Sequence, residues 1–283
     1  MIREQDQAAG LRRGNSSAPR LVRLRPATDG TTRIYAVTSG KGGVGKTQVA
    51  ANVAVGFAAE GKKVLLLDAD LGLASLDLAL GIKPRYDLLD VLTGRRSVDE
   101  IIVPGPGGVC LIPACPGRYD VANLDASQRA RLWDIVEKAA RDFDVLVIDT
   151  GAGIGSNAVG FASYADEVLL VTTPDPTALR DAYAMAKVLH RRSGVDRIHL
   201  VANQVASERE GAEIHARIDG IVRRFLTLRL EYLGGVPRDE AVREAVTRGE
   251  PLVLTAKSSA AARAISGLVR RLRLLDATEV HPC

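Results

Sequence analysis

The stretch SGKGGVGKT, residues 39–47, decides the fold of this chain. It follows the apolar run IYAVTS (34–39) and precedes a helical pattern over 47–60 that Gly61 closes. Residues 40–47 match G-x-x-x-x-G-K-[ST], the phosphate-binding loop, in the strand–loop–helix setting that this motif requires. The glycines let the loop turn its backbone N–H groups toward one point, and the following helix adds the positive end of its dipole. The stretch therefore predicts a nucleotide phosphate site after the first strand.

The side chains of this loop have distinct expected roles. Lys46 is placed to reach the outer phosphates, and the Thr47 hydroxyl is placed to ligate Mg²⁺. Lys41 is an additional lysine, and three readings are open: it adds charge near the γ-phosphate, it reaches a nucleotide bound by a second protomer, or it is simply solvated. The residues expected to contact the nucleotide here are Gly40, Lys41, Gly42, Gly43, Val44, Gly45, Lys46, Thr47 and Gln48.

Three carboxylates fall at the ends of apolar runs. Asp68 and Asp70 end KVLLLDAD (63–70), and Asp149 lies near the end of DVLVIDT (144–150). In a doubly wound sheet the carboxyl ends of the strands form the ligand crevice, so all three are expected to face the phosphates. Each alone could instead cap a helix. Thr47, Asp68 and Asp149 form the expected magnesium set. Within it, Asp149 is expected to contact the groups that coordinate the ion, not the ion itself.

Short apolar runs recur along the chain and show no alternation of apolar and polar residues. Such runs are typical of strands that are buried on both faces of a mainly parallel sheet. Helical patterns separate them, which predicts a doubly wound α/β fold with helices on both faces of the sheet. Besides 34–39, the expected strands lie at 63–70, 109–114, 144–150, 167–173, 197–204 and 228–237. Besides 47–60, the expected helices lie at about 126–141, 156–164, 176–192, 208–225, 238–248 and 258–275.

Composition excludes several classes of protein. The 283 residues contain no apolar run of the ~18 residues that span a bilayer and no secretory signal pattern, so a cytoplasmic location is expected. Three cysteines and four histidines do not cluster, which argues against a disulfide framework or a histidine/cysteine metal site. Residues 1–33 hold seven arginines and three acidic residues, which leaves 31 basic and 31 acidic residues in the rest. A neutral core gives no bulk attraction for nucleic acid.

At the level of whole motifs the chain resembles the MinD/ParA ATPases. GKGGVGKT (40–47) is similar to their deviant Walker A motif, LLLDADLGLASLDLALG (65–81) to their switch I, and VLVIDTGAGIG (145–155) to their Walker B and switch II. Residues 86–102 and 165–183 are also similar, and the resemblance covers about residues 33–255. It implies an Mg²⁺-dependent ATPase that dimerises around two ATP molecules, turns over slowly and separates after hydrolysis.

The resemblance also implies individual roles. Lys41 corresponds to the lysine that crosses to the partner's phosphates, and Asp70 to the aspartate that positions the attacking water. With Lys46, these form the expected catalytic set. Asn203 corresponds to an adenine-contacting asparagine, although an asparagine at a strand end also suits a turn. Pro237 and Asp239 correspond to a loop near the base.

The N-terminal segment points to one branch of this family. DQAAGLR (6–12) fits the DQAxxLR pattern of the flagellar number regulators, called FlhG or FleN. In that branch the segment docks on the GTPase FlhF as a short helix and stimulates it, so the resemblance implies a partner held through Asp6, Gln7, Ala8, Leu11 and Arg12, with Gln7 orienting the attacking water. Ala8, Leu11 and Arg12 share one helical face, and a peptide this short would fold on binding.

Alternatives remain open for function and for organisation. A MinD-type division-site ATPase and a ParA-type DNA-segregation ATPase share the core motifs, whereas an iron–sulfur carrier would need paired cysteines that the chain lacks. Flagellar switch proteins or a transcription activator are further candidate partners, and the cytoplasmic membrane or cell pole is an alternative location. The basic pattern at 259–275 is typical of a last core helix or of a membrane-binding helix.

The expected units are an activating segment (1–13), a linker (14–32), the ATPase domain (33–275) and a disordered tail (276–283).

Overall fold

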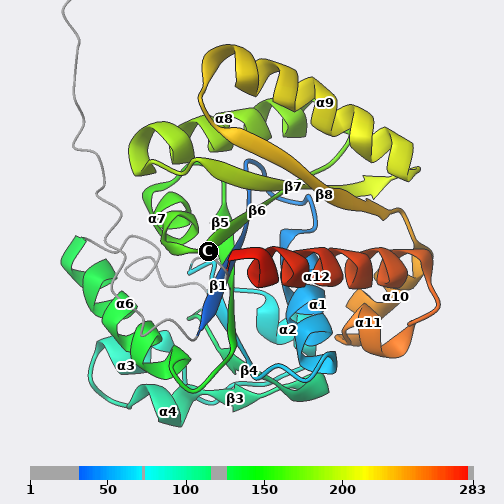
Figure 1. Cartoon of the computed structure of the whole chain (residues 1–283). Coiled ribbons are helices and arrows are strands. Elements are labelled where there is room, and N and C mark those ends of the chain that lie inside the picture. Colours follow the sequence, from blue (N-terminus) through cyan, green and yellow to red (C-terminus); the bar gives the residue numbers. More distant parts are fainter. Residues whose placement is uncertain (1–31, 72–73, 116–125, 280–283) are drawn as a thin grey trace, which may run out of the picture.

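The computed structural model describes residues 32–71, 74–115 and 126–279 (Figure 1). Its centre is an eight-stranded sheet in the order β3-β4-β2-β5-β1-β6-β7-β8. All neighbouring strands are parallel except β3 and β4. The expected fold class, a doubly wound and mainly parallel sheet, is confirmed. The strands are β1 Arg33–Ser39, β2 Val64–Ala69, β3 Val103–Pro104, β4 Val109–Ile112, β5 Val145–Ala152, β6 Glu167–Thr172, β7 Arg197–Val205 and β8 Arg229–Pro237.

Helices cover both faces of the sheet (Figure 1). Two hydrophobic cores result, one on each face. One core includes α3 Leu88–Leu92, α4 Val98–Ile101, α6 Ala126–Ala140, α7 Ser156–Tyr164, α8 Pro176–Ser193 and α9 Glu208–Phe225. The other includes α1 Lys46–Ala59, α2 Leu76–Leu80, α10 Glu240–Arg248, α11 Leu252–Thr255 and α12 Ala260–Glu279. A short 3₁₀ turn, η2 Pro106–Gly108, precedes β4.

Strand β1 shows why the sequence lacks alternation. Ile34 and Ala36 belong to one core, while Tyr35 and Val37 belong to the other, and all four are buried. A strand that is covered on both sides needs apolar residues at successive positions. This double burial holds the carboxyl end of β1, and with it the phosphate-binding loop, in a fixed place.

Helix α12 uses its apolar face in the core. Ile265, Leu268, Val269 and Leu272 are at most 3% exposed, and the helix packs against β8 and α1. Membrane binding through this face would therefore require α12 to leave the core. Within the described residues, no helix is long and apolar enough to cross a membrane.

The C-terminal boundary of the domain differs from the expected one. Helix α12 continues to Glu279, so the expected tail at 276–283 is wrong over its first four residues. The extension is explained by Asp276, whose carboxylate pairs with Arg33 Nε at 2.9 Å and accepts a hydrogen bond from the Tyr35 hydroxyl. The expected activating segment (1–13) and nearly all of the linker (14–32) lie outside the described residues. At Thr32 the hydroxyl donates to the Ala140 carbonyl at 2.8 Å.

Candidate functional site

The phosphate-binding loop runs from the end of β1 to the start of α1, and Gly40, Gly43 and Gly45 are required in it for steric or backbone reasons. Gly43 and Gly45 have φ values of 80° and 86°, in the left-handed region that favours glycine. At Gly40 an added Cβ would lie 2.0 Å from the backbone oxygen of Asp181 in α8. A side chain at Gly40 would push the loop away from α8. The loop backbone therefore has the shape that the motif predicts.

Lys46 and Asp149 form a buried ion pair at the centre of the site. Lys46 Nζ lies 2.7 Å from Asp149 Oδ1, and the two side chains are 7% and 0% exposed. Burial raises the pKa of Asp149, and the neighbouring Lys46 opposes that rise. Asp149 Oδ2 is buried without a hydrogen-bond partner in the part of the chain that the structure describes.

Asp68 lies beside Asp149 because β2 and β5 are neighbours in register at these two residues. Its carboxylate accepts hydrogen bonds from the backbone N–H groups of Asp70, Ser75 and Leu76 at 3.0–3.1 Å. Burial, followed by the Asp149 charge, raises the pKa of Asp68 to about 7. Because it accepts from the N–H groups of Ser75 and Leu76, Asp68 also caps the start of α2, eight residues further along the chain.

Thr47 completes this cluster. The Ser75 hydroxyl donates to the Thr47 hydroxyl at 3.2 Å, so the first turn of α1 contacts the loop that precedes α2. The described residues contain no group of three or more His, Cys, Asp or Glu side chains that could hold a metal. A magnesium ion bound with a nucleotide needs only a few protein ligands, since phosphate oxygens and water supply the rest. Asp149 Oδ2 and the buried Asp68 carboxylate fit such an ion, because Lys46 supplies one positive charge beside two buried carboxylates.

Lys41 lies apart from this buried cluster. Its Nζ contacts Asp175 Oδ1 at 3.2 Å and the Thr177 hydroxyl at 2.5 Å, and its side chain is 42% exposed. Asp175 is the N-cap of α8 and accepts hydrogen bonds from the backbone N–H groups of Thr177 and Ala178. Hydrogen bonds from Thr177, Ala178 and Lys41 hold the pKa of Asp175 far below its usual value. The two lysines of one loop thus point to different places, Lys46 into the interior and Lys41 to the surface.

Asp70 lies just past the end of β2. Its carboxylate lies near Gly151 in β5, where an added Cβ would be 3.7 Å from Asp70 Oδ1. The Asp70 charge also acts on the pKa of Asp149, as one of the smaller contributions that raise it. Asp70 therefore lies near Asp149, where β2 and β5 end.

Asn203, Pro237 and Asp239 lie on the other side of the loop, at the ends of β7 and β8. The Asn203 amide donates to the Val44 carbonyl at 2.7 Å, and a Cβ on Gly45 would lie 2.3 Å from its Nδ2. Asn203 therefore holds the phosphate-binding loop by a side-chain hydrogen bond. A residue that served only to form a turn at the strand end would not need this contact. Asp239 caps α10 and accepts from the backbone N–H groups of Ala261 and Ala241, which lower its pKa.

Sequence reasoning missed Asp175, Thr177 and Ser75. The first two belong to DPT (175–177), an aspartate followed by proline at the first helical position, which is a readable helix start. Nothing in the sequence indicates that this helix start faces Lys41, 134 residues earlier in the chain.

Known proteins are similar to this chain in sequence and in fold. Residues 35–252 match the family described as the CobQ/CobB/MinD/ParA nucleotide binding domain. The antiactivator FleN of Pseudomonas aeruginosa is 44% identical over 216 residues, which cover 76% of this chain and 77% of that protein. The flagellum site-determining protein YlxH of Helicobacter pylori is 37% identical over 218 residues, 77% of this chain and 74% of that protein. The septum site-determining protein MinD of Pyrococcus horikoshii, solved in complex with Mg-ADP, superposes with a TM-score of 0.71 at 27% identity, covering 87% of this chain and 97% of that one.

Proposed function

This chain belongs to the CobQ/CobB/MinD/ParA family, and from that membership we propose that it is an ATP-driven switch that dimerises around nucleotide and regulates flagella. The family membership supports ATP hydrolysis, and the likeness to FleN and YlxH supports a role in flagellar number or placement. The single observation that carries the dimer is Lys41. Lys41 lies at the surface of the phosphate-binding loop, where its contact with Asp175 is exposed, whereas Lys46 already serves the interior. Lys41 could therefore exchange its contact with Asp175 for one with the nucleotide of a second chain.

The proposed mechanism is phosphoryl transfer to water. Lys46 and the loop backbone would bind the phosphates, and Thr47, Asp68 and Asp149 would hold Mg²⁺. When bound, that ion supplies charge neutralisation of the phosphates. Asp70 would orient the attacking water from its position beside Gly151. Positioning and charge neutralisation would carry the catalysis, and we expect slow turnover because the output is a change of assembly.

The remaining nucleotide contacts are proposed for the β7–β8 side. Asn203, Pro237 and Asp239 would lie near the base, and Gln48 on the first turn of α1 near the phosphates. Asn203 would keep its bond to Val44, so the base site and the phosphate loop would be mechanically linked.

The dimer is tested by light scattering of the full chain with and without ATP and Mg²⁺. We expect a dimer mass with ATP in the native protein, a monomer throughout for Lys46→Ala, and a longer-lived dimer for Asp70→Ala. A native protein that remains monomeric at saturating ATP would contradict the proposed switch. Binding of a fluorescent ATP analogue, measured in parallel, separates loss of nucleotide binding from loss of association.

The N-terminal segment gives the proposal its flagellar partner. We propose that DQAAGLR (6–12) activates an FlhF-type GTPase, with Leu11 and Arg12 as anchors and Gln7 at the hydrolytic water. A synthetic peptide of residues 1–20 and its Gln7→Ala variant would be added to that GTPase while GTP hydrolysis is followed. Stimulation by the native peptide alone supports the role. Equal rates with both peptides would leave the ATPase proposal intact and remove the activating role.

A further inference from the structure

Two short helices begin on opposite sides of the phosphate-binding loop. Helix α2 begins where Asp68, at the end of β2, accepts from the backbone N–H groups of Ser75 and Leu76. Helix α10 begins just after β8, where its N-cap Asp239 accepts from the Ala241 N–H at 3.0 Å. Strand β1, which leads into the loop, lies between β2 and β8 in the sheet. Each helix is therefore attached to one side of the candidate nucleotide site.

The other ends of these two helices contact each other through glycines. Gly81 and Gly249 are the C-caps of α2 and α10, each with a φ of 64°. A Cβ on Gly81 would lie 2.6 Å from the Gly249 carbonyl oxygen. A Cβ on Gly249 would lie 2.9 Å from the Leu78 carbonyl oxygen and 3.3 Å from the Gly81 Cα. The two backbones are thus in direct contact with no room for a side chain between them, and we call this contact the α2–α10 joint.

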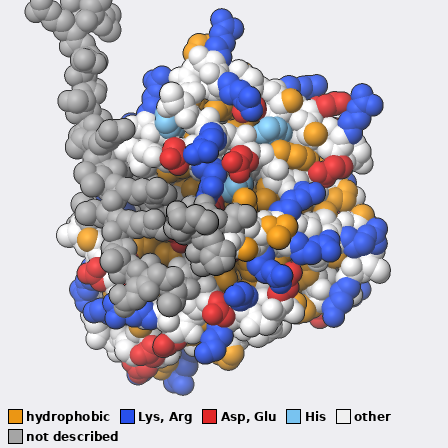
Figure 2. Space-filling view, in the orientation of Figure 1, with side chains coloured by type: hydrophobic (Ala, Val, Ile, Leu, Met, Phe, Trp, Pro, Cys, Tyr) orange, Lys and Arg blue, Asp and Glu red, His pale blue; other side chains and the backbone are white. Residues whose placement is uncertain are grey.

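The outer sides of α2 and α10 leave both helices room to shift. Leu78 of α2 is 69% exposed. Of the nine residues of α10, all of which the structure describes, Ala245 alone is buried. Arg243 of α10 pairs within its own helix, with Glu240, and Figure 2 shows Lys and Arg interspersed with Asp and Glu in a similar way over the face in view. A shift of α2 can therefore pass to α10 through the joint without separating a deeply buried element from the core.

The hydrogen bonds of Asp68 give a reason for such a shift. Asp68 Oδ2 accepts from both Ser75 and Leu76, which uses its two lone pairs, and Oδ1 accepts from the Asp70 N–H. An Asp68 carboxylate that also faced a magnesium ion would have to turn or give up one of these bonds. Either change moves the N–H groups at the start of α2, and α2 is a single short turn of helix.

We propose that Gly81 and Gly249 are positioning residues that couple the two sides of the nucleotide site. Through the α2–α10 joint, Mg²⁺ at the Asp68 side strengthens the hold on the base at the Asp239 side, and the base strengthens the hold on Mg²⁺ to the same degree. This inference rests on the proposed function, since it takes Mg²⁺ and the base to lie on those two sides. Asp239 also accepts from the Ala261 N–H of α12 at 3.0 Å, so a shift of α10 acts on a residue that is held in place from the other side.

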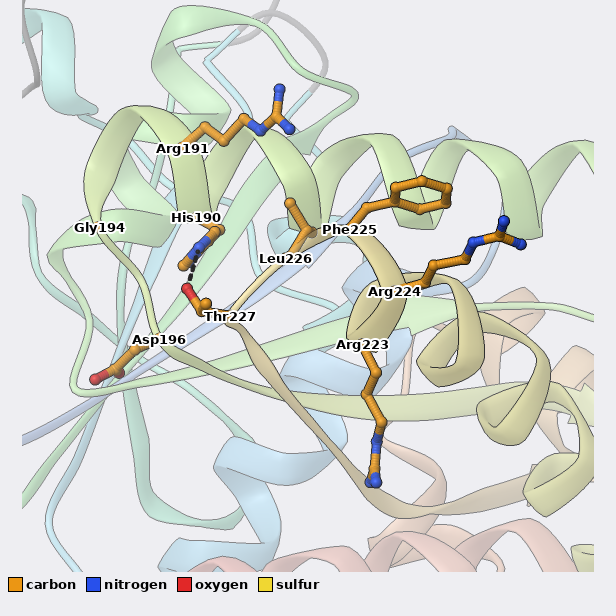
Figure 3. Close-up of a pocket in the computed structure, with 9 residues that line it drawn as sticks. All are labelled: His190, Arg191, Gly194, Asp196, Arg223, Arg224, Phe225, Leu226 and Thr227. Atoms are coloured by element: carbon orange, nitrogen blue, oxygen red, sulfur yellow. Dashed lines mark hydrogen bonds between the residues drawn. The ribbon is translucent and has the colours of Figure 1, made fainter.

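A purely structural role for the two glycines is to end their helices, which a positive φ alone would explain. Gly194 offers the matched case. It is the C-cap of α8 with a φ of 70°, it lies beside the pocket drawn in Figure 3, and a Cβ on it would meet no atom within 4 Å in the described part of the chain. Gly194→Ala therefore carries the backbone strain of Gly249→Ala without disturbing a contact.

The test is isothermal titration calorimetry of the full chain with ADP and with inorganic pyrophosphate, each in Mg²⁺ and in EDTA. ADP carries the base and pyrophosphate does not, and neither ligand drives the proposed ATP-dependent dimer. The proteins are the native chain, Gly81→Ala, Gly249→Ala and the control Gly194→Ala, and circular dichroism melting checks that each is folded. The affinity of a free ligand for Mg²⁺ cancels when the same ligand is compared between proteins.

We expect Mg²⁺ to raise the affinity of the native chain for ADP, and this enhancement to fall about fivefold or more in Gly249→Ala and Gly81→Ala, as is typical of coupled sites. The enhancement for pyrophosphate should stay the same, because pyrophosphate has no base. Gly194→Ala should match the native chain with both ligands. An unchanged enhancement for ADP in the joint variants, an equal fall for pyrophosphate, or an equal fall in Gly194→Ala would overturn the coupling while the proposed function stands. A native chain that binds neither ligand would overturn both.

Hydrogen exchange of the native chain tests the joint without a substitution, should the joint variants fail to fold. At saturating pyrophosphate, Mg²⁺ should change the amide exchange of α10, although α10 begins on the far side of the phosphate-binding loop from Asp68. Exchange in α10 that is the same with Mg²⁺ and with EDTA would overturn the coupling.

Discussion

At the scale of single residues, the contact between Lys41 and Asp175 holds the surface lysine against its own chain. Asp175→Asn keeps an oxygen for capping α8 and removes the charge that attracts Lys41. We expect the ATP-dependent dimer to form at lower ATP concentration in this variant, because the monomer loses a competing contact. Mass by light scattering across an ATP titration measures it, with Asp87→Asn, the same change at the N-cap of α3, as the matched control. An unchanged or higher ATP requirement for Asp175→Asn would show that the contact does not oppose association.

Asp68 makes a prediction about pH. Its pKa is raised by burial to about 7, from a usual value of 3.8. Between those values the folded state binds a proton that the unfolded state does not, so this group's contribution to stability is full below pH 3.8 and is lost as pH rises to about 7. Nucleotide-free Asp68→Asn should therefore show a flatter fall of melting temperature over this range than the native chain. Parallel curves for the two proteins would mean that the Asp68 pKa is not raised.

Features of single residues could be predicted from the sequence where they depend on neighbouring residues, and not where they depend on residues far apart in the chain. The loop 40–47 could be read from sequence because its function depends on neighbouring residues in a fixed order. The Asn203–Val44 bond joins residues 159 positions apart, and the Lys41–Asp175 contact joins residues 134 apart. Such pairs depend on strand order, which apolar runs alone do not specify.

At the scale of elements, α7 links the nucleotide site to the only tryptophan of the chain. Trp133 on α6 stacks on Tyr164 of α7, with ring centres 3.5 Å apart, and α7 begins just after β5, the strand that carries Asp149. We expect ATP with Mg²⁺ to change Trp133 emission, because a shift at the start of α7 would alter this stacking. Lys46→Ala, which should not bind ATP, is the control. Full binding of a labelled nucleotide without any change in emission would mean that α7 does not move.

The long elements were predictable and the short ones were not. Helices α6 to α9 fall within one or two residues of the predicted ranges because their apolar period extends over several turns. Helices α2, α3, α4 and α11 have only four or five residues, too few to show a period. Helix α2 depends on a cap from Asp68, which only the folded sheet brings to it.

At the scale of the whole molecule, Glu167 joins the start of the domain to its interior. It is 1% exposed and pairs with Arg33, Arg197 and His199. Burial alone would raise its pKa, but His199 and the two arginines outweigh burial and lower it. Its contribution to stability is therefore present above pH 4.5 and is lost as pH falls through the lowered pKa. Glu167→Gln should cost about 3 kcal/mol of unfolding free energy in urea at pH 7.

The matched control for this prediction is Glu240→Gln, a change of the same kind at an exposed ion pair with Arg243. It should cost well under about 1 kcal/mol. Similar costs for the two variants would show that the buried cluster contributes no more than a surface pair.

The contact between Arg33 and Asp276 has a practical consequence for the chain as a polymer. It holds the first strand and the last helix of the domain together, with Arg33 Nε and Asp276 Oδ1 2.9 Å apart. Domains whose ends are adjacent tolerate circular permutation. A short glycine–serine bridge from the end of α12 to Thr32 should allow new termini to be cut at an exposed turn such as Arg95. The permuted chain would begin at a different element, while the sheet and the phosphate-binding loop keep their arrangement.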